Sequence, residues 1–221
     1  MKSMAGNRLR NGVFAAFFLL LAVYLGCYFL LLVTSGPYQP TDRMDAETAM
    51  RLASVAVPIL RIILAGSGFA MTAVFLFAAM RLSRRVSGIL ALAYTLFKFG
   101  TAILPSLITI NAVHSYFVPF LPLSMLSILS ASLLYWLLTP WLAGRINEPV
   151  SMLLVLLLSR ALSLVILFLP DESKALSVGI VGWAFAKEFV VEASVIFLVY
   201  ALLRWIFRSK KVSSSEGLDN G

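Results

Sequence analysis

The chain has 221 residues, of which 61% are hydrophobic and 13% charged, and its formal net charge is +8 at pH 7. Soluble domains are about 45–50% apolar and about 25% charged, so this composition excludes an ordinary soluble globule and a disordered chain. A single cysteine and a single histidine are too few for an internal disulfide, a zinc site or a Cys–His nucleophile pair. We therefore predict an integral membrane protein that binds no metal.

Six segments are long and apolar enough to cross a membrane, because a spanning helix needs about 20 mostly apolar residues. In chain order they cover residues 12–33, 51–80, 86–110, 120–141, 150–169 and 176–207. Short polar connections separate them, and none is long enough for a soluble domain. We predict an all-α polytopic membrane protein in which residues 1–209 form a compact bundle of six transmembrane helices. Residues 210–221 are predicted to be a disordered cytoplasmic tail.

The lysines and arginines are distributed unevenly among the ends of these segments. With a cytoplasmic N-terminus, eleven of the 18 lie on the cytoplasmic side, three lie outside and four lie within the spans. Cytoplasmic loops of membrane proteins carry such an excess of positive charge. We predict a multi-pass protein of the plasma (inner) membrane with both termini in the cytoplasm. Because topology explains the basic excess, we expect the lipid bilayer, and no nucleic acid, as a partner.

Ionisable residues near the centres of the predicted spans are the main functional signal. A charge at the bilayer centre costs about 2.5–3.5 kcal/mol, so such groups are expected to pair with one another or to line a wet cavity. The four cations and two anions leave a formal surplus of +2. A bound anion would offset this surplus. A desolvated lysine that loses its proton would instead reduce the surplus without a ligand. The six residues are Arg61, Lys98, Arg160, Lys187, Glu188 and Glu192.

Helical spacing relates several of these residues to their neighbours. Glu188 and Glu192 are four residues apart and so share one face of the sixth segment. On the third segment, Tyr94 and Lys98 have the same spacing, and on the fifth Ser159 precedes Arg160. The predicted ligand-binding set is therefore Arg61, Tyr94, Lys98, Arg160, Lys187, Glu188 and Glu192.

Two functions remain open at this point. The first is a transport or substrate-binding component whose charged midplane site takes an anionic or zwitterionic ligand, either a small molecule or a lipid head group. The second is a non-transporting structural or assembly subunit of a membrane complex, in which the charges determine which helices pack together and partner subunits surround the chain. The sequence contains no HExxH, GxSxG or P-loop motif, so we expect neither enzymatic activity nor a cofactor.

Overall fold

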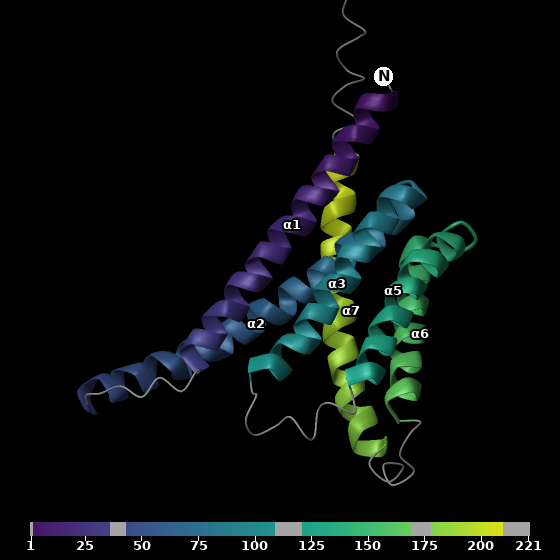
Figure 1. The fold of residues 1–221 in the computed structure, drawn as a ribbon. Helices are drawn as coiled ribbons and strands as arrows, with labels where there is room; N and C mark the ends of the chain where they lie inside the picture. The colour runs from purple at the N-terminus through teal and green to yellow at the C-terminus, as the bar shows by residue number, and fades with distance from the viewer. Residues whose placement is uncertain (1, 36–42, 109–120, 169–177, 210–221) are drawn as a thin grey trace, which may run out of the picture. The chain divides into compact units, whose positions relative to one another are not determined.

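The computed structural model describes the backbone of residues 2–35, 43–108, 121–168 and 178–209, and side chains within 7–31, 54–101, 122–166 and 186–207. Across these ranges every regular element is a helix (Figure 1), which confirms the predicted all-α class. The predicted tail over 210–221 lies outside the described residues, as does the only histidine, His114. The helices are α1 (Lys2–Ser35), α2 (Arg43–Arg81), α3 (Arg84–Ile108), α5 (Leu121–Ala143), α6 (Glu148–Phe168) and α7 (Val178–Ser209).

Five of these helices contain a segment long and apolar enough to cross a membrane, which is the character of a membrane protein. Helix α3 is not among them, and it carries Arg84 and Arg85 at its start and Lys98 further along. The count of six spans and their packing as a compact bundle therefore stay predictions. The five candidate spans are Asn7–Leu31, Ser54–Arg81, Pro122–Ala143, Glu148–Ile166 and Ala186–Phe207.

Polar residues mark the starts of α3 and α6. The backbone N–H of Ser87 donates to the carbonyl of Ser83 at 3.0 Å, which makes Ser83 the residue that precedes the first turn of α3. In the same way, the N–H of Ser151 donates to the carbonyl of Asn147 at 2.9 Å before α6. Serine and asparagine are both preferred at this position. Pro149 lies in the first turn of α6, where the N–H that proline lacks would have no helical partner.

The chain divides into two units, residues 1–74 and 75–221. The first unit contains α1 and the part of α2 up to residue 74. Within this unit, α1 passes close to α2 near Gly68. A Cβ atom on Gly68 would lie 3.6 Å from Cε2 of Tyr24, which is an ordinary van der Waals distance, so the tyrosine ring packs closely against α2 at this point. Small residues commonly permit such close approach between membrane helices.

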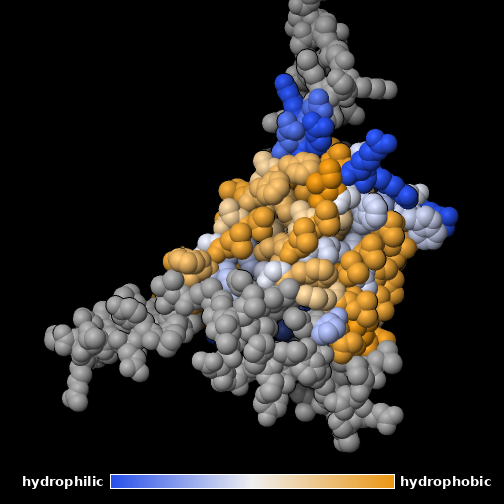
Figure 2. All heavy atoms as spheres, viewed as in Figure 1, coloured by the Kyte–Doolittle hydropathy of each residue, from blue (hydrophilic) through white to orange (hydrophobic). Residues whose placement is uncertain are grey.

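The second unit contains the end of α2 together with α3, α5, α6 and α7. Helix α5 packs most extensively against α6 and next against α3, while α7 contacts α6. Aromatic rings join the end of α2 to α7, because the Phe77 ring lies 6.0 Å from that of Tyr200 and 5.8 Å from that of Phe207, between centroids. Figure 2 shows apolar side chains over much of the visible surface of the described helices, with strongly hydrophilic residues gathered near helix ends.

Candidate functional site

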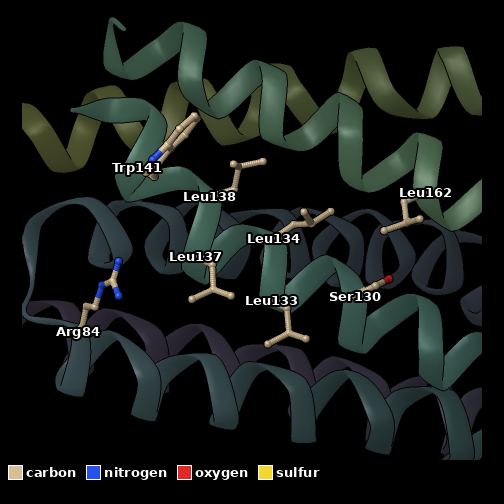
Figure 3. A pocket seen from close by; sticks show the side chains of 8 residues that line it. All are labelled: Arg84, Ser130, Leu133, Leu134, Leu137, Leu138, Trp141 and Leu162. Carbon is tan, nitrogen blue, oxygen red and sulfur yellow. The ribbon is translucent and has the colours of Figure 1, made fainter. Parts of the chain in front are cut away.

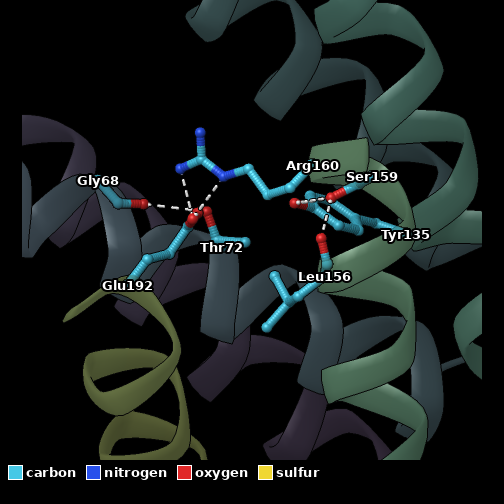
Figure 4. Close-up of polar contacts among 7 residues, drawn as sticks. All are labelled: Gly68, Thr72, Tyr135, Leu156, Ser159, Arg160 and Glu192. Carbon is cyan, nitrogen blue, oxygen red and sulfur yellow. Dashed lines mark hydrogen bonds and ion pairs between the residues drawn. The ribbon is translucent and has the colours of Figure 1, made fainter. Parts of the chain in front are cut away.

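An arginine and a glutamate from two apolar helices form an ion pair in the second unit. Nε of Arg160 on α6 donates to Oε2 of Glu192 on α7 at 2.8 Å, and Nη2 donates to the same oxygen. The two side chains point toward one another, and the remaining guanidinium nitrogen points away from the carboxylate (Figure 4). The Glu192 side chain is 7% exposed and that of Arg160 is 30% exposed. The carboxylate is thus buried, whereas the guanidinium keeps an accessible side.

The helical repeat places both partners of this pair at the packed surface of their helices. On α7, Glu192 belongs to a buried stripe with Ile196, Tyr200 and Leu203, which recur every three or four residues. On α6, Arg160 lies at the edge of a buried stripe of similar spacing (Met152, Val155, Leu156 and Ser159). A charged carboxylate without a partner would be very costly to bury in such surroundings. The hydrogen bonds from the Arg160 guanidinium offset this cost for Glu192.

A buried tyrosine from α5 joins the same region. The hydroxyl groups of Tyr135 and Ser159 are 2.9 Å apart, and Ser159 donates its own proton to the carbonyl of Leu156 at 2.9 Å. Because the serine has a single proton, Tyr135 is the donor in the first bond. Since Ser159 directly precedes Arg160, this bond fixes α5 beside the part of α6 that carries the ion pair.

Aromatic rings extend the region to α3. The Tyr94 ring lies 6.4 Å from the Tyr135 ring, and Phe75 lies 5.2 Å from Tyr94 and 6.2 Å from Tyr135, all between centroids. Nζ of Lys98 is 5.5 Å from the centroid of the Tyr94 ring, which is within the range of a cation–π contact. Lysine, two tyrosines, serine, arginine and glutamate thus form a continuous series of contacts across α3, α5, α6 and α7.

The structure places the seven predicted site residues in different settings. Lys187 and Glu188 are exposed on α7, although Glu188 is close enough to Arg160 to interact with it electrostatically. Arg61 belongs to the 1–74 unit and is exposed there. Their membership of the site stays a prediction. The four that belong to the contact series are Tyr94, Lys98, Arg160 and Glu192.

Sequence reasoning missed Tyr135 and Phe75 as members of this region. Phe75 carries no signal, because phenylalanine is common throughout the apolar segments. Tyr135 carries a weak one: tyrosines in membrane proteins favour the two interfaces, whereas Tyr135 lies about two turns inside the end of α5. A tyrosine at such depth requires a partner for its hydroxyl, and Ser159 supplies it.

A second polar cluster joins the end of α2, the start of α6 and α7. Nη2 of Arg81 lies 2.6 Å from Oε1 and 2.9 Å from Oε2 of Glu148, and the hydroxyl of Tyr200 donates to Oε2. The side chains of Arg81 and Glu148 are 41% and 24% exposed. The bond from Tyr200 to Glu148 is a finding of the structure.

No metal site or relative supplies a function. Among the described side chains, no three His, Cys, Asp or Glu residues lie close enough to hold a metal ion, and Cys27 is a buried free thiol. No known family model, curated protein or solved structure shows significant similarity to this chain. The function must therefore be inferred from the chemistry of the contact series itself.

Proposed function

We propose that this protein is a transport or substrate-binding component of a membrane, whose ligand is an anionic or zwitterionic small molecule held at Lys98 and Arg160. The observation that carries the proposal is the unequal exposure of the ion pair: Arg160 is 30% exposed while its partner Glu192 is 7% exposed. Partial exposure lowers the desolvation cost of any ion pair, but here it also leaves one guanidinium nitrogen that points away from Glu192 (Figure 4). A ligand anion needs an accessible guanidinium on a fixed support.

The charges in the contact series suit such a ligand. Within the contact series, Lys98 and Arg160 supply two positive charges and Glu192 one negative charge, so a bound anion would lower the net charge of the series. The arginine fork binds carboxylate or phosphate through parallel N–H bonds, and Glu192 holds that fork in one orientation. Glu188, one turn from Glu192 on α7, would receive the ammonium group of a zwitterion. Arg61 and Lys187 are proposed to complete the positive surroundings.

The membrane arrangement that goes with this proposal has α3 as a sixth span, packed with the other five in a compact bundle in the plasma membrane. Both chain termini are proposed to lie in the cytoplasm, on the strength of the lysine and arginine distribution. The sequence has no nucleotide-binding motif. Transport driven by ATP would therefore require a partner subunit.

A structural or assembly subunit is the second candidate, and a specific observation favours it. Both described ion pairs, Arg160–Glu192 and Arg81–Glu148, join one cation to one anion on different helices. Such pairs can determine which helices pack together without binding any ligand. In this alternative, exposed Lys187 and Glu188 on α7 would contact a partner subunit within the membrane.

Ligand-dependent stability distinguishes the two candidates. We would measure the melting temperature of the protein in detergent with a panel of phosphate, citrate, glutamate and glycine betaine, for the wild type and Lys98→Met. A ligand at one hundred times its dissociation constant adds about 2.7 kcal/mol, or about 5–10 °C for a chain of this length. We expect Lys98→Met to fold but to lose this shift, because methionine replaces the volume of lysine without its charge.

The matched control is Arg10→Met, which removes an exposed arginine near the start of α1 and should keep the full shift. Lack of stabilisation by any member of the panel would contradict the binding proposal. So would equal shifts in the wild type and Lys98→Met. Failure of Lys98→Met to fold, with a normal Arg10→Met protein, would instead support the structural candidate.

A further inference from the structure

An apolar hollow lies between α5, α6 and the start of α3, and its lining includes neither Arg160 nor Glu192. Its volume is about 440 Å³, and it is lined by five leucines together with Ser130, Trp141 and Arg84. Arg84 and Trp141 lie at one end of the hollow, while Ser130 and Leu162 lie at the other (Figure 3). We call it the Arg84 hollow. It is a leucine-lined groove with a cation at one end.

A second arginine adds to the charge at that end. The guanidinium carbon of Arg145, in the turn after α5, lies 3.9 Å from the centroid of the Trp141 ring. Arg84, Trp141 and Arg145 are all exposed. Tryptophan and arginine are typical of the level where lipid head groups meet the hydrocarbon region. The charged end of the hollow thus has the composition of a membrane interface, and the leucines continue from it along α5 toward the bilayer interior.

The size of the hollow limits what can occupy it. One turn of an α-helix with its side chains is about 5 Å long and about 10 Å across, which corresponds to a cylinder of roughly 400 Å³. The hollow thus has about the volume of one helical turn, so a partner helix lying over it would fill it with the side chains of about one turn only. An acyl chain is much narrower than a helix, and a phosphate attached to it would reach the arginines at the charged end.

We propose that the Arg84 hollow binds one anionic phospholipid, with an acyl chain along the leucines and the phosphate at Arg84. The guanidinium of Arg84 provides the selectivity for a negatively charged head group, because it is the only charged side chain among the eight that line the hollow. Helices α3, α5 and α6 each contribute to the lining, so the bound lipid would fasten these three helices together. This site is independent of the proposed ligand site at Lys98 and Arg160.

Melting temperatures of the full-length protein in neutral detergent test the proposal. The additions are dioleoyl phosphatidylglycerol, dioleoyl phosphatidylcholine and inorganic phosphate. We expect phosphatidylglycerol to raise the melting temperature by about 5–10 °C near saturation, and the other two to have little effect. Equal stabilisation by phosphatidylcholine would overturn the role of Arg84, and equal stabilisation by inorganic phosphate would show that the acyl chain is not bound.

Four variants locate the lipid. Arg84→Gln should weaken phosphatidylglycerol binding at least tenfold, whereas Arg85→Gln, which removes the neighbouring exposed arginine outside the lining, should change it less than twofold. Leu137→Trp should also abolish binding, because the larger ring fills the groove while Arg84 remains. Lys98→Met should keep the lipid effect, which separates this site from the proposed function. Equal losses in Arg84→Gln and Arg85→Gln, or wild-type binding by Leu137→Trp, would contradict the proposal.

Discussion

Two arginine–glutamate pairs among the described residues differ mainly in depth. Arg160 and Glu192 are 30% and 7% exposed, whereas Arg81 and Glu148 are 41% and 24% exposed. The first pair lies within the apolar lengths of α6 and α7, and the second lies where α2 ends and α6 begins. The same two functional groups thus meet in two very different surroundings.

A tyrosine lies near each ion pair, but the two hydroxyl groups donate to different acceptors. At the helix ends, Tyr200 donates directly to the carboxylate of Glu148. In the deeper region, Tyr135 donates to Ser159 instead. The buried carboxylate of Glu192 accepts from Nε and Nη2 of Arg160. An arginine and a tyrosine thus donate to the more exposed carboxylate, whereas both donors described at the buried one belong to one guanidinium.

Depth decides how much each pair contributes. An exposed ion pair contributes about 0–1 kcal/mol because water screens it, whereas removal of one partner of a buried pair costs about 3–5 kcal/mol. The Arg81–Glu148–Tyr200 cluster is thus expected to contribute only slightly to the stability of the helix packing. The Arg160–Glu192 pair is expected to be essential to the fold and to remain available for a ligand.

The largest effect is expected from Glu192→Ala. It leaves Arg160 without its carboxylate and should lower the free energy of unfolding by about 3–5 kcal/mol, measured by chemical denaturation in detergent. Glu192→Gln should cost less, because the amide oxygen still accepts a hydrogen bond from Arg160. If both variants unfold like the wild type, Glu192 does not have the buried, paired setting described above.

An intermediate effect is expected from Tyr135→Phe, which removes the hydroxyl that donates to Ser159 but keeps the ring contacts with Tyr94 and Phe75. The loss should be about 0.5–1.5 kcal/mol, or a fall of a few degrees in melting temperature. Tyr28→Phe, on α1, is the matched control: no described hydrogen bond involves its hydroxyl, so it should melt like the wild type. Equal melting of the two variants would show that the Tyr135–Ser159 bond adds no stability.

The smallest effect is expected from Glu148→Gln. It removes the charge that pairs with Arg81 but keeps an oxygen that can accept from Tyr200, so the loss should be below about 1 kcal/mol. Because salt screens exposed charges, the difference from the wild type should shrink when sodium chloride is raised from 0.1 M to 1 M. The corresponding difference for Glu192→Gln should change little. A similar salt dependence in both variants would remove the distinction in depth between the two pairs.

The sequence predicts the helices well because each depends on local properties. Apolar lengths identify all five candidate spans. The two members of the central pair are also visible in advance, since Arg160 and Glu192 are among the few charges inside apolar segments. The sequence does not show which glutamate pairs with Arg160, because Glu188 and Glu192 share a helix face. Only the packing of the helices buries Glu192 and leaves Glu188 exposed.

The second cluster could not be predicted from the sequence for a related reason. Arg81 and Glu148 both lie at segment ends, where a charge is most simply explained by contact with water. Their pairing depends on the end of α2 approaching the start of α6, although 67 residues separate the two in sequence. Such contacts are determined by how helices pack, and hydrophobic periodicity contains no information about them.

The most direct test of the central claim exchanges the charges of the deep pair. In the double variant Arg160→Glu with Glu192→Arg, the ion pair can form again, so most of the stability lost in either single variant should return. The accessible group would then be a carboxylate, and an anion that stabilises the wild type should no longer raise the melting temperature. If the double variant recovers its stability and the same anion stabilises it as fully as the wild type, the accessible guanidinium of Arg160 is not the ligand site.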